Sequence, residues 1–501
     1  MSHGDLRRRT IHSLFWQFLG VGGQRVVQIL GPMVLWRTLD PSDIGLFVIL
    51  LAGIGVVEAL TAFMGEQSSI SSDRGAEPHY LDTVFTVRVL RSIVISSALA
   101  TLAFPLAWFF GTPETSSTYW LPGLFLALAG NGLIDSLQSP ARAASMKGMQ
   151  FRRVALGDFV AAVLGIAATL GFAFWWRDVW ALVAGHLAST AMRTVLSYAS
   201  APYRPRAHLD RTVLRELLHY NAGAAGVPFL LLMIFTAPAF VLGKLAKEGT
   251  VAVFDGAGRL AKLPEDIFLR VLAPVAIPAY AALKNDIPSL ARAWSGAVHS
   301  FLLIGTPLTV TLAWCGDALP EVMFGAKYVA IPGLFALLAV HGGLAGLTSV
   351  VGPLFWAIGQ PQWDRKAQFF RCITIYGLGI PGAIWGGPVG FAVATCASIL
   401  AALWFSLAHA LPILRLRLRD LGQEMADGLR LGVGLGAVLL ALDWLLPLDG
   451  WWRLLVAAVT GGPLIGYQLL RLLRHRHEVP PNPPTPPSPP SREEEVADIF
   501  V

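Results

Sequence analysis

Charged residues recur at helical spacing in the apolar segment 250–282. The residues that follow one another at intervals of 4, 3, 4 and 4 are Asp255, Arg259, Lys262, Asp266 and Arg270. A helix turns about 100° per residue, so these side chains fall within about 80° of one face, where neighbours of opposite sign can pair. Charges inside a bilayer are costly and usually face water or one another. The face therefore predicts an aqueous cavity, with an interfacial helix whose side chains reach the headgroups as the alternative.

A second polar stripe lies in segment 11–36. Gln17, Gln24 and Gln28 share one helical face there, with Arg25 at its edge. At a rise of about 1.5 Å per residue, Arg25 and Arg259 both fall near the middle of the membrane. Amide and guanidinium groups can replace the water that a polar, anionic molecule loses on entering the bilayer. The predicted substrate-binding residues are Arg25, Arg259, Lys262, Gln17, Gln24 and Gln28.

Three carboxylates in apolar surroundings could couple transport to an ion gradient. They are Glu58, Asp135 and Asp255, and the ion would be a proton or sodium. Arg88 and Arg91 lie one turn apart in segment 81–110. Either they reach the cytoplasmic headgroups or they line a cavity, and the sequence leaves both readings open.

Other polar residues carry weaker signals. The histidines at 186 and 341 are isolated, and we expect them to be hydrogen-bonded structural groups. The cysteines at 315, 372 and 396 lack the spacing of a zinc or redox site, so we expect no metal and no cofactor. The sequence contains no GxxxxGK[ST] motif and no large outer loop with clustered catalytic side chains, which argues against an ATPase and against an enzyme.

The composition predicts that the elements positioning these residues are membrane-spanning helices. Hydrophobic residues make up 54% of the 501-residue chain, the mean hydropathy is +0.59, and only 14% of residues are charged, against roughly 25% in soluble domains. A span needs about 20 mainly apolar residues, which gives about fourteen helices. The predicted spans are 11–36, 43–65, 81–110, 119–138, 153–176, 178–200, 213–243, 250–282, 294–318, 328–358, 367–385, 388–411, 425–447 and 450–473.

The basic residues give these spans an orientation. Cytoplasmic loops are enriched in arginine and lysine. If the N-terminus lies in the cytoplasm, most basic residues fall in inner segments, and the outer segments hold only Arg37, Arg177, Lys244, Lys247, Lys327 and Arg453. We therefore expect a multi-pass protein of a bacterial cytoplasmic membrane with both termini inside. The net charge of +6 then reflects sidedness, and we expect no nucleic-acid partner.

An internal repeat indicates how the helices are grouped. Val34-Leu35-Trp36-Arg37 aligns with Val241-Leu242-Gly243-Lys244, and Ile44-Gly45-Leu46-Phe47 aligns at the same offset with Val251-Ala252-Val253-Phe254. The sequence thus predicts an all-α membrane protein with two six-helix lobes, related by pseudo-two-fold symmetry around a central cavity, plus a C-terminal helix pair. The expected units are an N-terminal lobe (1–200), a C-terminal lobe (201–411), a two-helix unit (412–475) and a disordered proline-rich cytoplasmic tail (476–501).

Several stretches resemble a known family. They are Leu39-Asp40-Pro41-Ser42-Asp43-Ile44-Gly45-Leu46-Phe47, His79 to Arg91, Asp178 to His186, Pro202-Tyr203-Arg204-Pro205, and Phe324-Gly325-Ala326-Lys327-Tyr328. Over the chain to about residue 411, the sequence resembles the Wzx-like polysaccharide-biosynthesis flippases. These flippases translocate lipid-linked oligosaccharides and belong to the multidrug/oligosaccharidyl-lipid/polysaccharide exporter superfamily.

The resemblance implies a substrate and partners. It implies a central cavity between two lobes and movement of undecaprenyl-pyrophosphate-linked oligosaccharide to the outer leaflet. Membrane lipids, a polysaccharide polymerase and chain-length or export proteins are the partners it implies. Family members carry basic residues in the helices that correspond to 11–36 and 250–282, where this chain has Arg25 and Arg259. The chain departs from that pattern by also carrying Asp255, Glu265 and Asp266.

Two other functions compete with this one. A multidrug cation exporter of the same superfamily would need a carboxylate deep in segment 11–36, where this chain has Arg25 and no acid. A membrane-embedded glycan polymerase or ligase would need a catalytic loop at the water interface, and the predicted outer loops are short. The sequence favours the flippase over both.

Overall fold

The residues of this chain that can be placed in space are almost all helical. A computed structural model describes residues 30–60, 77–111, 120–142, 151–224, 226–267, 283–446 and 450–475, together with Val27, Ser69, Ser72, Arg74, Gly75, Ser145, Ala276 and Tyr280. Every regular element among them is a helix. Eight of these helices are long and apolar enough to cross a membrane. The all-α, multi-pass class is confirmed, whereas the count of fourteen spans stays a prediction.

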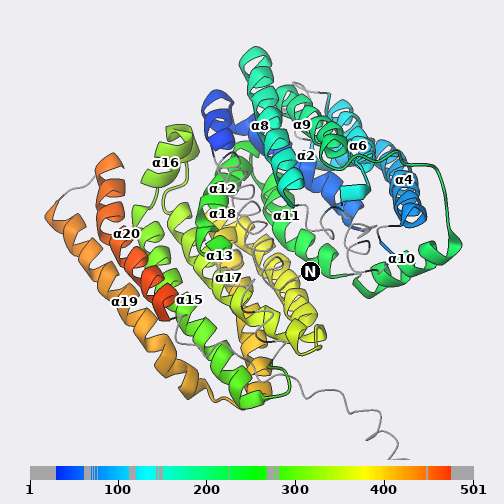
Figure 1. Cartoon of the computed structure of the whole chain (residues 1–501). Helices are drawn as coiled ribbons and strands as arrows, with labels where there is room; N and C mark the ends of the chain where they lie inside the picture. The colour runs from blue at the N-terminus through cyan, green and yellow to red at the C-terminus, as the bar shows by residue number, and fades with distance from the viewer. Residues whose placement is uncertain are drawn as a thin grey trace, which may run out of the picture.

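Two groups of helices pack side by side (Figure 1). The N-terminal helices are α2 (Pro41–Leu60), α4 (Pro78–Phe110), α6 (Leu121–Ser136), α8 (Phe151–Trp176) and α9 (Val179–Ser200). The C-terminal helices are α11 (Val227–Leu245), α12 (Glu248–Ala261), α13 (Leu263–Ile267), α15 (Ile287–Cys315), α17 (Leu334–Ala357) and α18 (Gln362–Leu414). The grouping follows the predicted lobes, whose boundaries remain predictions.

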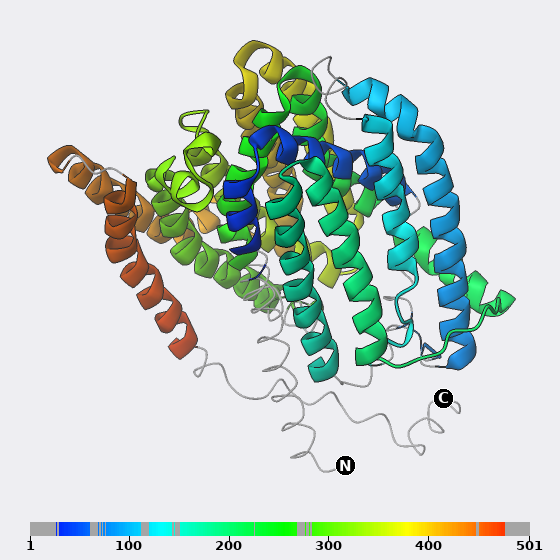
Figure 2. The same cartoon turned by 90° about the horizontal axis from the view of Figure 1, so that it is seen from above.

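The last two helices lie at the edge of the molecule. Helices α19 (Leu418–Leu445) and α20 (Gly450–His475) pack along α15, away from the N-terminal helices (Figures 1 and 2). An ion pair joins them, since Arg453 Nη2 lies 2.7 Å from Asp443 Oδ2. Helix α20 also contacts the short helix α16 (Ala318–Phe324), which is followed by the 3₁₀ helix η2 (Ala326–Tyr328). This pair occupies the place of the predicted two-helix unit.

The predicted break between spans 367–385 and 388–411 is present in the structure. Helix α18 runs continuously over both spans except at Gly387, where φ is 58° and ψ is −146°. This conformation suits glycine, and the next residue is Pro388, which cannot continue the backbone hydrogen bonding of a helix. Two helices of membrane-spanning length therefore meet at this kink.

The prediction for segment 213–243 was wrong at its start. The apolar span α11 begins only at Val227, after Gly226 with a φ of 94°. The preceding residues form a separate amphipathic helix, α10 (Arg211–Ala224), whose Val213 and Leu217 pack on α4. Basic and acidic residues on the other face of α10 are exposed, which explains why it does not continue into the span.

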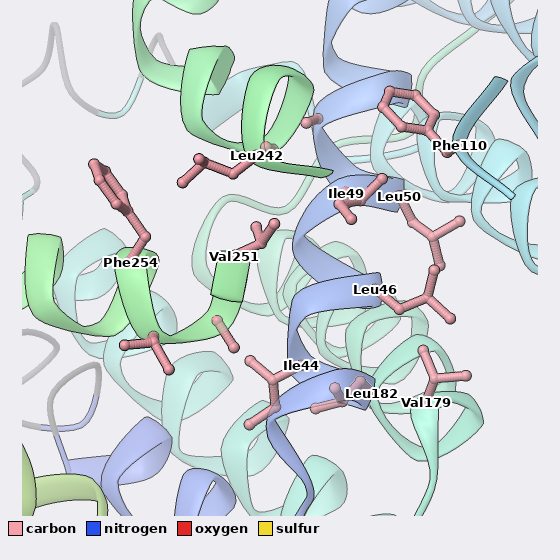
Figure 3. Close-up of a cluster of buried hydrophobic side chains, with 14 of the residues drawn as sticks. Ile44, Leu46, Ile49, Leu50, Phe110, Val179, Leu182, Leu242, Val251 and Phe254 are labelled. Atoms are coloured by element: carbon pink, nitrogen blue, oxygen red, sulfur yellow. The ribbon is translucent and has the colours of Figure 1, made fainter. Parts of the chain in front are cut away.

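Helix α2 lies between the two groups. In Figure 3 it passes between Leu242, Val251 and Phe254 of the C-terminal helices and Phe110, Val179 and Leu182 of the N-terminal helices. Gly45 permits the closest approach, because a Cβ there would lie 1.8 Å from the carbonyl oxygen of Glu248. Any side chain at position 45 would push α2 and α12 apart.

Hydrogen bonds from basic side chains to backbone carbonyls join the two groups of helices at the predicted outer end of α2. Arg37 donates to the carbonyl of Val322, and Lys244 donates to that of Phe109 at 2.6 Å. Lys327 donates to the carbonyl of Leu39 and lies 3.4 Å from Asp40. Arg37 and Lys244 are aligned by the repeat, and each reaches across to the other group of helices. These bonds hold the two groups together at one end.

The contact between α2 and α12 has the arrangement expected around a pseudo-two-fold axis. At the offset that aligns Arg37 with Lys244, Ser42 aligns with Gly249. A Cβ on Gly249 would lie 3.7 Å from the backbone nitrogen of Ser42, so this position contacts its own equivalent. Contacts between equivalent residues occur where a two-fold axis passes through an interface.

Tryptophan residues mark one set of helix ends. Of the described tryptophans that are more than 60% exposed, all but Trp404 lie within a few residues of a predicted outer end of a span: Trp108, Trp120, Trp175, Trp385, Trp444, Trp451 and Trp452. Tryptophan is enriched at membrane–water interfaces. We therefore expect these ends to lie at a membrane–water interface.

We predict the side of the membrane on which reporter fusions emerge. Fusions after Arg211 and Arg365 should read cytoplasmic, and fusions after Lys247 and Asp317 should read outside, because of the distribution of basic residues. A paired alkaline phosphatase and green fluorescent protein reporter measures this. An outside signal at Arg211 would contradict both the helix order and the two-lobe arrangement.

Candidate functional site

Two cavities flank α2, and each contains charged side chains. The α12 cavity, of about 280 Å³, is lined by α2, α11, α12, α13, α17 and α18. The α4 cavity, of about 450 Å³, is lined by α2, α4, α6 and α9. Val48, Leu51 and Ala52 of α2 face the first, and Leu51, Ile54, Gly55 and Glu58 face the second. Adjacent faces of one helix thus form the wall between the cavities.

The α12 cavity gathers the charged face predicted from segment 250–282. Asp255, Arg259, Lys262 and Glu265 all line it. The helix is interrupted at Lys262, where α12 ends and the short α13 begins, and Pro264 lies in the first turn of α13. The helix is therefore broken beside Pro264, and the break turns the polar residues on both sides toward the same space.

Arg259 and Asp255 form an ion pair within this cavity. Arg259 Nε donates to Asp255 Oδ2 at 2.6 Å. The Arg259 side chain is 56% exposed, and its exposed surface faces the cavity. Its two terminal nitrogens have no partner among the described residues, so Arg259 can donate to a molecule in the cavity while Asp255 balances its charge.

Sequence reasoning missed two residues of the α12 cavity. Arg371 of α18 lines it but was counted only as a cation of an inner segment. His341 of α17 lines it too, with Nε2 at 3.5 Å from Nη2 of Arg371. The signal that could have found His341 is its depth, since it lies near the middle of the predicted span 328–358, whereas Arg371 lies only four residues inside the span 367–385. Three cations and two carboxylates therefore face this space.

The packing of α17 brings these residues to the end of α12. A Cβ at Gly342 would lie 1.9 Å from the carbonyl oxygen of Ala261. Only glycine allows this approach. It brings His341, the residue before Gly342, and Lys262, the residue after Ala261, to the same cavity. The hydroxyl of Tyr376 donates to the carbonyl of Met233 at 2.9 Å and fixes α18 against α11 on the same side.

The α4 cavity contains the other two predicted coupling carboxylates. Glu58 and Asp135 both line it, together with Arg88, Arg91 and His186. Arg88 donates to the carbonyls of Ser136 and Gln138 at the end of α6. Arg91 donates to the carbonyl of Glu58 at 2.9 Å. The two arginines therefore line a cavity, which resolves the alternative that the sequence left open.

Polar groups in the α4 cavity are closely spaced. Gln138 donates to Asp135 at 2.5 Å, and Asn131 Oδ1 is buried with no hydrogen-bond partner in the described structure. Asp255, the third coupling candidate, lies in the other cavity. The predicted ligands Gln17, Gln24, Arg25 and Gln28 lie outside the described residues, so their roles stay predictions.

A comparison with known protein families identifies the family to which the chain belongs. A family model described as "Polysaccharide biosynthesis protein" matches residues 34–332, which is more than half of the chain. The chain belongs to this family. The match spans α2 to η2 and so includes most of the residues that line both cavities.

Two similar curated proteins have names that refer to the biosynthesis of polysaccharides. The chain is 21% identical over 381 residues to the succinoglycan biosynthesis transport protein ExoT of Rhizobium meliloti, and the aligned region covers 76% of each chain. It is 22% identical over 394 residues to the lipopolysaccharide biosynthesis protein WzxC of Escherichia coli, covering 78% of this chain and 77% of the relative.

Solved structures show the same fold. The lipid II flippase MurJ in an inward closed conformation matches with a TM-score of 0.69 at 13% identity, covering 92% of this chain and 99% of that one. An inward-facing multidrug resistance MATE family transporter of the MOP superfamily matches with a TM-score of 0.58 at 15% identity, covering 78% and 96%. At these identities the likeness concerns the fold alone.

We predict that Arg259 does more than neutralise Asp255. Arg259→Ala should lower both thermal stability and export, because it leaves the Asp255 carboxylate unpaired in the membrane. Arg259→Ala combined with Asp255→Ala should regain stability but stay inactive, because the donors toward the cavity are gone. Arg259→Lys should keep normal protein levels and impair transport, since lysine lacks the fork.

The measurements are melting temperature in detergent and surface polysaccharide in a complemented deletion strain. Export that returns in the double variant would show that the pair is only structural.

Proposed function

We propose that this chain flips undecaprenyl-pyrophosphate-linked oligosaccharide units across the bacterial cytoplasmic membrane, with both termini in the cytoplasm. The units would serve exopolysaccharide, capsule or O-antigen synthesis. The observation that carries the proposal is the α12 cavity, a membrane-embedded space between α2 and the C-terminal helices that holds more cations than carboxylates. Membership of the polysaccharide biosynthesis protein family supports it.

The polar lining of the cavity suits the most costly step of translocation, which is the passage of the sugar head through the bilayer. A sugar head cannot cross the hydrocarbon core alone, because each hydroxyl would lose its water partners. Arg259, Lys262, Thr395 and His341 offer polar groups within the bundle, and Arg371 adds a guanidinium. The lipid tail would stay in the bilayer while the head passes, and no covalent bond need change. We accordingly assign no catalytic residue and no enzyme activity.

Movement would occur by alternating access. The carbonyl bonds of Arg37, Lys244 and Lys327 close the predicted outer end in the present conformation. Opening that end requires breaking a few hydrogen bonds, each worth about 1 kcal/mol net, and separating α2 from α12. Binding of substrate could supply a free energy of this size.

An ion gradient would give the cycle its direction. We assign Glu58 and Asp135 as the first candidates for proton or sodium coupling, because both face the α4 cavity across from one another on α2 and α6. Asp255 is the weaker candidate, since it is committed to Arg259. The shared helix α2 would transmit a change in the α4 cavity to the α12 cavity.

A multidrug exporter is the main alternative, since a MATE transporter shares the fold. A cationic drug would meet Lys262 and Arg371 in the α12 cavity, which disfavours it. A polymerase that joins oligosaccharides is a weaker alternative, because the cavity charges lie inside the helix bundle and not in an outer loop.

The proposal predicts what a deletion strain accumulates. Loss of the chain should leave fluorescent lipid-linked oligosaccharide on the cytoplasmic leaflet and deplete surface polysaccharide, and the intact chain should restore both. Lipid extraction with head-group labelling measures the first quantity. Unchanged lipid-linked oligosaccharide combined with new drug sensitivity would identify an exporter, and extended but untranslocated chains would not fit either transporter.

A further inference from the structure

Arg371 is the most deeply buried cation of the α12 cavity, and it makes no ion pair with a described carboxylate. The residue is 7% exposed, and its Nε has no hydrogen-bond partner. No described carboxylate lies within 4 Å of its guanidinium. The ring of His341 lies 3.5 Å from Nη2, and the carboxylate of Glu265 attracts the guanidinium from beyond ion-pair distance. A buried, unpaired guanidinium costs several kcal/mol, so the fold retains it at a loss of stability.

Lys262 is a second cation of the cavity that makes no ion pair among the described residues. Its ammonium lies 4.9 Å from the centre of the Phe235 ring and makes no ion pair with a described carboxylate. Arg259 differs from both, because Asp255 balances its charge. Glu265 also lines the cavity and attracts both Lys262 and Arg371, so that one carboxylate faces two cations. The space therefore offers a planar fork at Arg371 and a point charge at Lys262.

We propose that Arg371, together with Lys262, forms the subsite that binds the diphosphate of the substrate, and that Arg259 serves the sugar side. This assignment rests on the proposed function and deepens it. A guanidinium fork donates hydrogen bonds to two phosphate oxygens at once, and an ammonium neutralises the neighbouring phosphate. A diphosphate supplies two adjacent negative groups, whereas a single carboxylate of an acidic sugar supplies one.

His341 positions the fork. Its ring approaches Nη2 from α17, while Arg371 projects from α18, so the guanidinium is held between two helices. The close approach at Gly342 fixes α17 against the end of α12, which carries Lys262. The two cations are thus placed by rigid helix contacts before substrate arrives, which lowers the cost of ordering them on binding.

The test uses the full chain in lipid nanodiscs and two sugar-free probes. The probes are undecaprenyl pyrophosphate and undecaprenyl phosphate, and binding is measured by native mass spectrometry. The intact chain should prefer the diphosphate. Arg371→Met should weaken diphosphate binding by about tenfold or more and remove the preference, because two charge-assisted hydrogen bonds are lost.

Stability separates a binding role from a structural one. Arg371→Met should melt at the same or a higher temperature than the intact chain, because a buried charge without a partner is removed. Arg371→Lys keeps the charge without the fork, so it should melt normally and bind the diphosphate with intermediate affinity. Arg292→Met, at an exposed position in the first turns of α15, is the matched control and should change neither quantity.

Each contrary result has a distinct meaning. Equal diphosphate binding by the intact chain and Arg371→Met would overturn this assignment and leave the proposed function standing. Parallel loss of melting temperature and affinity in both Arg371 variants would assign Arg371 to the fold and not to the ligand. Failure of the intact chain to bind either lipid would contradict the proposed function and the assignment together.

Discussion

The close approach of α2 to α11 and α12 is the contact on which the rest of the structure depends. It requires a residue without a side chain at position 45, and it places apolar residues of α2 against both groups of helices at once. Because α2 is wedged between the groups, its faces become the walls of two cavities. The bonds from Arg37, Lys244 and Lys327 to carbonyls then fasten one end. Closure, the cavities and their separation all follow from this packing.

The charged residues are arranged differently in the two cavities, which suits ion coupling in the α4 cavity and substrate binding in the α12 cavity. In the α4 cavity, arginines donate to backbone carbonyls at 2.9 Å, and the acidic residues Glu58 and Asp135 line the same space. In the α12 cavity, one arginine is paired and one is not. A buried cation without a partner lowers stability, and a membrane protein retains such groups where function requires them. Leu51 lines both spaces, so a shift of α2 that reshapes one must also reshape the other.

Much of the fold could be predicted from the sequence, because apolar length and helical periodicity act locally. The all-α membrane-spanning class and the boundary between spans 367–385 and 388–411 followed from such rules. The start of span 213–243 did not, because apolar Val213 and Leu217 are buried against α4 and not in lipid. The site was harder to predict. Asp255 and Arg259 are neighbours on one helix, whereas Arg371 and His341 join them only through the packing of α17 and α18, which no spacing in the sequence encodes.

In the proposed transport cycle, substrate leaves when α2 separates from α12 at the predicted outer end. A Cβ at position 249 would lie 3.5 Å from that of Pro41, which suits a disulfide. The most direct test is therefore translocation of fluorescent lipid-linked oligosaccharide by proteoliposomes that contain Pro41→Cys/Gly249→Cys, with the three native cysteines replaced by alanine. Oxidation should stop translocation and a reductant should restore it, while either single cysteine should have no effect. Translocation by the cross-linked protein at the rate of the reduced protein would contradict the account.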